Sequence, residues 1–238
     1  MQGIFKTVKN PFSDFQPERY HKIEHNAERV MRVKEGVINA LVNSYRGIVD
    51  KETNNLAWMV EHEHVVKVYE KIVIATQGLV CSAGDIEAFC SVIDNAEEIS
   101  LRVPGPLGLY LAALINHCPE KKLVLRISDY QRSFHFLGYH LPKNKILILD
   151  GNAGDFTGSA MCGGSLIIHG SGGDWCGAGM LSGELRIHKN AGQMTGEWMH
   201  GGVIKVQGLI ESIGQNRFGG EIFQHGKAVG LNNPGNLP

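Results

Sequence analysis

Carboxylates spaced by a fixed interval are the first side chains of this chain that could carry out chemistry. Asp155 and Asp174 lie 19 residues apart, each beside a glycine, and Gln193 follows at the same interval. Two stacked carboxylates could exchange protons with a substrate. Asp beside Gly at a chain reversal more often accepts backbone hydrogen bonds, and we favour this structural role.

Histidines form two further groups. His62 and His64 lie in the run EHEH, and on the strand that we expect there they would share one face, as two metal ligands do. No third ligand is identifiable in the sequence, so a polar strand face is favoured over a metal site. His169 and His188 are again 19 residues apart, with Asp150 one interval earlier. We expect a solvent-facing polar column there, and the alternative is the polar wall of a channel shared with a partner.

The cysteines do not form a recognisable ligand set. They are Cys81, Cys90, Cys118, Cys162 and Cys176, and no two of them form C-x-x-C. An iron–sulfur or zinc-ribbon site is therefore unsupported, and an odd number of thiols favours reduced, mostly buried side chains. The sequence leaves open whether Cys162 or Cys176 faces a partner. With no nucleophile elbow and no lysine-bearing phosphate loop, we predict no catalytic, cofactor-binding or metal-binding residue.

The 19-residue interval belongs to a repeat that positions these side chains. Three consecutive copies occupy 146–164, 165–183 and 184–202. A fourth copy, 203–220, is one residue short, and a fifth begins at Glu221 and ends after Gly226. The glycines in register are Gly154, Gly173 and Gly192, then Gly158, Gly177 and Gly196, then Gly164, Gly183 and Gly202. A fixed period with a short apolar run in each copy predicts a solenoid.

Each copy has the composition of one coil of a parallel β-helix. It opens with a short apolar run that suits a strand, and its glycines mark sharp corners. We expect Gly154, Gly173 and Gly192 to have positive φ or a close backbone neighbour that excludes Cβ. Stacking the coils would place Met161, Met180, Met199 and Phe218 in one interior column, as apolar core.

The coil pattern G-x-x-x-G-x-x-M-x-x-G, as in 154–164 and 173–183, resembles the GxGxG-motif family. This family includes the C-terminal domain of the glutamate synthase large (alpha) subunit and the C subunit of formylmethanofuran dehydrogenase. The resemblance covers about 146–226 and runs more weakly back to about residue 99. It implies a right-handed parallel β-helix that holds catalytic parts in register without taking part in the chemistry.

This resemblance also implies a function. We expect a non-catalytic scaffold subunit of a multi-subunit oxidoreductase complex, similar to the glutamate synthase domain, with the formylmethanofuran dehydrogenase subunit as the alternative. The expected partners are larger catalytic subunits, which would carry the flavin, iron–sulfur or molybdenum/tungsten cofactor. An alternative from another functional class is a free-standing β-helix assembly or binding module. β-Helix lyases have longer coils and hexapeptide acyltransferases repeat every six residues, so both fit less well.

Upstream of the clear repeat, two segments are read as degenerate coils. The segment 123–144 has a strand run followed by Gly138 and Leu141 at the spacing of the coil's second glycine and its Met. The segment 99–118 has a strand-like run and a Pro-Gly-Pro corner, and the alternative makes 107–117 a helix. We favour the coil because terminal coils of solenoids depart from consensus. The β-helix domain, with its C-terminal tail, is therefore placed at 99–238.

Residues 1–98 have few glycines and read as a small α/β region that covers one end of the β-helix. We expect a helix from Pro17 to Asn43, strands over 57–76, and a short helix over 84–95 capped by Ser82 or Asp85. The 238 residues carry a net charge of −1, which gives no case for nucleic acid or an anionic membrane. Without a membrane-length apolar run or a signal peptide, a cytoplasmic location is expected.

Overall fold

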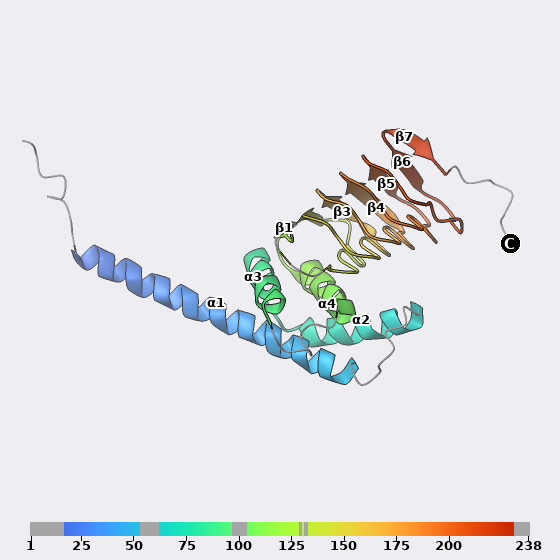
Figure 1. Ribbon diagram of the computed structural model, residues 1–238. Helices are drawn as coiled ribbons and strands as arrows, with labels where there is room; N and C mark the ends of the chain where they lie inside the picture. The colour runs from blue at the N-terminus through green and yellow to red at the C-terminus, as the bar shows by residue number, and fades with distance from the viewer. Residues whose placement is uncertain (1–16, 53–61, 97–103, 129, 131–132, 231–238) are drawn as a thin grey trace, which may run out of the picture.

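The computed structural model describes residues 17–52, 62–96, 104–128, 130 and 133–230. Helices come first along the chain and strands follow, and Figure 1 shows the helices gathered at one end of a stack of strands. The helices are α1 (Pro17–Glu52), α2 (His62–Thr76), α3 (Ala83–Asp94) and α4 (Pro104–His117). The strands are β1 (Lys122–Arg126), β2 (Ile146–Asp150), β3 (Cys162–Ile168), β4 (Ser182–Ile187), β5 (Val203–Val206), β6 (Glu221–Gln224) and β7 (Lys227–Val229).

Strands β1 to β6 form a parallel sheet in chain order, so each coil of the chain lies directly on the one before it. The register repeats every 19 residues, from Ile146 to Ser165, Glu184 and Val203. The next partner of Val203 is Glu221, which places the shortened coil where the sequence has it. The predicted parallel β-solenoid is confirmed, with about four turns.

The interior of the solenoid is built from stacked apolar columns. Met161, Met180 and Met199 are each 0 % exposed, as predicted. Leu141 is also 0 % exposed and begins this column in the first coil, which confirms that 123–144 is a coil. A column on the sheet side is made of Leu123, Leu147, Leu166, Leu185, Ile204 and Ile222, all buried. Equivalent positions therefore bury equivalent side chains, and the core runs the length of the stack.

Phe218 does not continue the Met column, so this prediction was wrong. Its side chain is 54 % exposed. Because the fourth coil lacks one residue, the Phe218 N–H donates to the Met199 carbonyl just as the His200 N–H donates to the Met180 carbonyl. Phe218 is thus the equivalent of His200, and the two rings stack with centroids 4.6 Å apart. The partly buried Arg217 takes the position of the column.

The corner glycines follow the second of the two expected alternatives. Gly154, Gly173 and Gly192 do not have positive φ, but a Cβ on each would collide with the coil below. At Gly154, for example, it would lie 2.8 Å from the carbonyl oxygen of Phe134. The second glycine of each coil adopts the left-handed conformation, with φ of 73° at Gly158 and 69° at Gly177. The corners therefore need glycine for two different reasons.

Before β1, the residues that the structure describes form helices joined by short turns and no strand, so the strands expected in this region are wrong. Residues 62–76, expected as strands, form α2, whose buried Val65, Val68 and Ile72 are spaced three and four residues apart. β-Branched residues favour strands, but tertiary packing overrides this preference and the segment forms a helix. His62 and His64 are therefore two residues apart on a helix, a spacing that does not place two positions on one face. The other part of the expected strands, 57–61, lies outside the described residues.

Two further expectations concern the remaining helices. The helix over 84–95 is confirmed as α3, and Ser82 and Asp85 together form a capping box at its start. The degenerate coil expected over 99–118 is wrong, because 104–117 forms α4, with 99–103 outside the described residues. Leu107 and the residues from Leu109 to Ile115 are 0–1 % exposed, so this helix is surrounded by apolar contacts. A helix that is buried all round lacks the periodicity that would have identified it.

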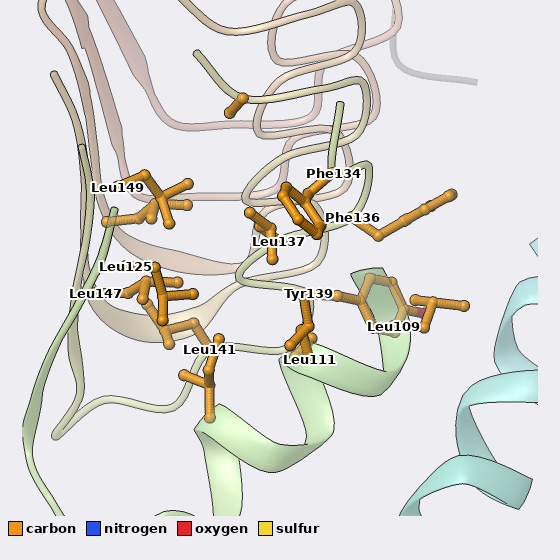
Figure 2. Packing of buried hydrophobic residues seen from close by; sticks show 14 of the residues in the cluster. Leu109, Leu111, Leu125, Phe134, Phe136, Leu137, Tyr139, Leu141, Leu147 and Leu149 are labelled. Carbon is orange, nitrogen blue, oxygen red and sulfur yellow. The ribbon is translucent and has the colours of Figure 1, made fainter. Parts of the chain in front are cut away.

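The helices cover the β1 end of the solenoid, where unpaired strand edges would otherwise be exposed. Figure 2 shows Leu111 of α4 near Leu141 and Leu109 near Tyr139, and these residues of α4 and of the first coils belong to one buried cluster. At the opposite end, β7 folds back antiparallel on β6 through His225 and Gly226, both with positive φ. The short charged β7 therefore ends the stack instead of offering another parallel edge.

A buried lysine joins the helices to the solenoid. Lys145 is 5 % exposed, and its Nζ donates to the carbonyl oxygens of Cys118 and of Glu120, the latter at 2.8 Å. Cys118 directly follows α4, so the ammonium group lies at the negative end of that helix. The Glu120 carboxylate in turn accepts the Ala83 N–H at the start of α3.

We expect Lys145→Met to destabilise the protein by about 2–4 kcal/mol, because hydrogen bonds to charged groups contribute about 1.5–3 kcal/mol and the carbonyls would be left buried. Urea unfolding followed by circular dichroism measures this change. Lys143→Met is the matched control, since Lys143 is exposed and lies two residues before Lys145. Equal midpoints for the two variants would show that Lys145 does not hold the joint together.

Candidate functional site

The carboxylates of the repeat are occupied by the backbone of the next coil. Asp155 Oδ1 accepts the Asp174 N–H at 2.9 Å, and Asp174 Oδ1 accepts the Gln193 N–H at 2.8 Å. In the coil below, the Asp155 N–H donates to Nδ1 of His135 at 3.0 Å. The structural role predicted for these corner residues is confirmed. Each carboxylate links two coils.

A polar column of histidines lies on the outside of the solenoid, as expected. The rings of His169 and His188 have centroids 5.1 Å apart, and Nδ1 of His169 lies 3.5 Å from Oδ1 of Asp150. Beside them is a groove of about 380 Å³ whose lining includes Ser128, Tyr130, Ser133, Asn152 and Lys189. The groove can hold water or the polar groups of a ligand. Whether a partner shares it stays a prediction.

The side chains of the histidine column are exposed to solvent. The His169 and Asp150 side chains are 46 % and 53 % exposed, so water solvates both partners of the pair. An ion pair in water contributes little energy, and an open groove does not desolvate a reacting group. The arrangement suits recognition by hydrogen bonding better than catalysis.

A thiol–imidazole pair, which the sequence did not reveal, lies where the helices meet the solenoid. Sγ of Cys162 is 3.8 Å from Nδ1 of His140, and the His140 ring stacks on Tyr69 of α2 with centroids 5.5 Å apart. Burial raises the pKa of Cys162 and lowers the pKa of His140. Both shifts favour the neutral forms, whereas a reactive cysteine needs a thiolate beside an imidazolium. The pair is therefore not an activated nucleophile in this arrangement.

The cysteines are unpaired, and four of them are buried, as predicted. Cys162 is exposed on a coil and Cys176 is fully buried in the solenoid, so of these two only Cys162 can face a partner. Burial raises the pKa of Cys176 to about 12, with the nearby Asp155 and Asp174 carboxylates adding to the shift. Among the residues that the structure describes, no group of three metal-ligating side chains comes together.

An apolar flank covers one exposed side of the solenoid. We define it as Cys162, Leu181, Trp198, His200 and Phe218. Leu181, His200 and Phe218 occupy equivalent positions, since each N–H donates to the Met carbonyl of the preceding coil. Trp198 and His200 lie on either side of the buried Met199, so both point outward. Leu181, Trp198 and Phe218 are 52 %, 49 % and 54 % exposed.

One coil position in the apolar flank has no side chain. Gly179 is the equivalent of Trp198 in the coil below, because their N–H groups donate to Glu197 and Asn216 in the same way. Gly179 has φ 63°, and the space where its Cβ would stand is open. The coil next to Trp198 therefore carries no side chain at the equivalent position, beside the exposed Leu181.

Aromatic rings also stack at one corner of the coils. The Phe136 and Phe156 rings are 4.9 Å apart and 8° from parallel, and Phe156 and Trp175 are 5.1 Å apart and 1° from parallel. All three residues have positive φ, between 52° and 60°. Non-glycine residues adopt this conformation at a cost, so the stack is held by its surroundings. The corner adds rigidity to the solenoid next to its exposed surface.

None of the helices that the structure describes is both long and apolar enough to cross a membrane. Comparisons with protein-family models, curated proteins and solved structures gave no significant match to this chain. The resemblance of its coils to the GxGxG-motif family therefore stays a prediction.

Proposed function

We propose that this chain is a non-catalytic scaffold subunit of a multi-subunit oxidoreductase complex, and that the apolar flank is where a larger catalytic subunit binds. The observation that carries the proposal is the exposure of Leu181, Trp198 and Phe218 on consecutive coils. Apolar side chains gathered on one face of a soluble protein mark an interaction site. Trp and stacked rings are also frequent among the residues that contribute most to protein association.

The frame behind the flank supports a role in holding parts at fixed distances. Each coil is joined to the next by a parallel strand pair and by the corner hydrogen bonds of Asp155 and Asp174. A stack with a fixed rise per coil, about 4.8 Å, presents residues on consecutive coils in one rigid row. A partner bound along this row is positioned without any movement of the scaffold.

The parent complex is proposed from the coil pattern alone. A right-handed GxGxG solenoid related to the C-terminal domain of the glutamate synthase alpha subunit is our first choice, and the C subunit of formylmethanofuran dehydrogenase is the second. In either case the flavin, iron–sulfur or molybdenum/tungsten cofactor belongs to the partner subunits. A free-standing assembly or binding module is distinguished from both by what the chain binds in its native host.

We expect native affinity purification of the full chain to recover larger, cofactor-bearing subunits in a fixed ratio. The double variant Leu181→Glu/Phe218→Glu should reduce their recovery at least tenfold, because two carboxylates would be buried against an apolar partner surface. Leu209→Glu is the matched control, since Leu209 is 63 % exposed and is not part of the flank.

Melting curves of the three proteins keep this experiment interpretable, because all three side chains are exposed and the fold should not change. Recovery of the chain alone would contradict the scaffold proposal. Undiminished recovery with the double variant would move the binding site away from the apolar flank.

A further inference from the structure

A polar groove lies where the first four coils leave the parallel sheet. It has a volume of about 380 Å³, which is in the range of small-molecule sites, about 300–1,000 Å³. The residues that line it end or follow the strands β1 to β4, from Ile127 to Lys189. The apolar flank lies at the other end of these strands, since Leu181 precedes β4 and Lys189 follows it. The groove is therefore a separate surface from the proposed subunit-binding site.

Asn152 lines this groove with two N–H donors that the described residues do not use. Its Oδ1 accepts the Ser171 N–H at 2.8 Å. A backbone N–H only donates, so the side-chain atom that faces it is the oxygen, and this fixes the orientation of the amide. In the part of the chain that the structure describes, Nδ2 of Asn152 has no hydrogen-bond partner. The amide is thus held in place with its donors left for a ligand.

Among the described residues that line the groove, one positive charge has no counter-charge. Nδ1 of His169 lies 3.5 Å from Oδ1 of Asp150, so that carboxylate already has a partner. The Lys189 N–H donates to the Gly170 carbonyl oxygen at 3.1 Å, which holds Lys189 against the preceding coil. The Lys189 ammonium itself forms no hydrogen bond or ion pair with any residue that the structure describes. The groove therefore favours a ligand that brings a negative charge.

We propose that the groove binds a small organic molecule through its oxyanion group, a phosphate or a carboxylate. The Lys189 ammonium supplies the charge, and the Asn152 amide and the Ser133 hydroxyl supply directional donors. Hydrogen bonds to an ionised acceptor are about twice as strong as those between neutral groups. Asn152 and Lys189 are two coils apart, a rise of about 10 Å, and the long, flexible stem of Lys189 lets both side chains reach one anion.

The site is tested by titrating the full chain with inorganic phosphate and, separately, with succinate. The readout is the nuclear magnetic resonance signal of the Asn152 side-chain amide, and constant ionic strength separates binding from salt screening. At least one probe should shift this signal to saturation. Saturation with phosphate alone assigns a phosphorylated ligand, saturation with succinate alone assigns a carboxylate ligand, and saturation with both assigns the shared oxyanion chemistry. A signal that saturates with neither probe would overturn the proposal.

Two variants test the donors, with the backbone amide signal of residue 189 as the readout. Asn152→Asp keeps an oxygen that accepts the Ser171 N–H but replaces both donors by a negative charge, so it should abolish binding. Lys189→Met should raise the dissociation constant by about tenfold, because it removes the charged donor. Asn190→Asp is the matched control, since Oδ1 of Asn190 accepts the Leu209 N–H at 3.0 Å in the same way and Asn190 does not line the groove.

Melting curves establish that each of these variants is folded. Unchanged binding by Asn152→Asp, or an equal loss with Asn190→Asp, would overturn the assignment of the groove. The double variant Leu181→Glu/Phe218→Glu should bind the anion as the wild-type protein does. The anion site is therefore independent of the proposed scaffold function, and either can fail without the other.

Discussion

Met180→Asp is expected to abolish the folded protein. Met180 lies in the middle of the Met column, is 0 % exposed, and has Met161 and Met199 in the coils on either side. Removing a buried Met side chain costs about 2–5 kcal/mol through lost contacts and the cavity left behind. A carboxylate at the same place adds a desolvation cost of several kcal/mol, since no cation can reach it between two apolar coils. The sum approaches the whole stability of a typical domain, about 5–15 kcal/mol.

The measurement is the yield of soluble protein and its circular dichroism spectrum, beside those of Met180→Leu. Met180→Leu keeps the volume and the apolar character of the side chain, and such exchanges usually cost less than about 1.5 kcal/mol. The leucine variant should therefore fold, and Leu141 occupies the same column in the first coil. A soluble, cooperatively folding Met180→Asp protein would place the column on the surface and invalidate the coil register.

The solenoid could be predicted from the sequence because the same physical requirements recur at equivalent positions in each coil. Met161, Met180 and Met199 must all be apolar, and Gly154, Gly173 and Gly192 must all lack a side chain. A single glycine in a loop carries little information, but three in register exclude most other folds. The same reasoning gave the role of Asp155 and Asp174, since a carboxylate at a repeated corner faces the backbone of the next coil.

The errors arise where the repeat ends or was never present. Phe218 was assigned by counting glycines, and the missing residue of the fourth coil shifted it to the outside. In α2 the many Val and Ile residues favour strands, although Val65, Val68 and Ile72 also fit a helical stripe. In α4 the apolar run is almost continuous. Such a run does not distinguish a buried helix from a buried strand.

The missing residue of the fourth coil also makes the apolar flank hard to see in the sequence. Leu181, His200 and Phe218 share a position only once the short coil is aligned by its hydrogen bonds. The contact between Cys162 and His140 joins consecutive coils, and it follows from the column register because Cys162 comes after Met161 and His140 comes before Leu141. Aligning Leu141 with the Met column would have revealed this contact from the sequence. The histidine column was found because its spacing is that of the repeat itself.

Gly173→Ala is expected to lower the melting temperature by roughly 5–15 °C, far more than Gly172→Ala. A Cβ on Gly173 would lie 2.7 Å from the Asp155 backbone nitrogen and from the Gly154 carbonyl carbon, and it would collide with the Asp155 carboxylate. Backbone atoms cannot move aside without opening the coil, and overpacking of this kind costs about 1–3 kcal/mol. Displacing the carboxylate also breaks its hydrogen bond from Asp174 N–H, which adds about 1–3 kcal/mol.

The neighbouring Gly172 is the matched control for this substitution. It is the equivalent of Ala153 and Ala191, which already carry a methyl group at the same place in their coils. A Cβ on Gly172 would approach Sγ of Cys176 at 2.5 Å, and a side chain can rotate away where backbone cannot. Thermal unfolding of both variants, at about 2–4 °C per kcal/mol for a chain of this size, separates the two costs. If the two midpoints coincide, the coils are not stacked through Gly173, and the carboxylate column that joins them has been placed in the wrong register.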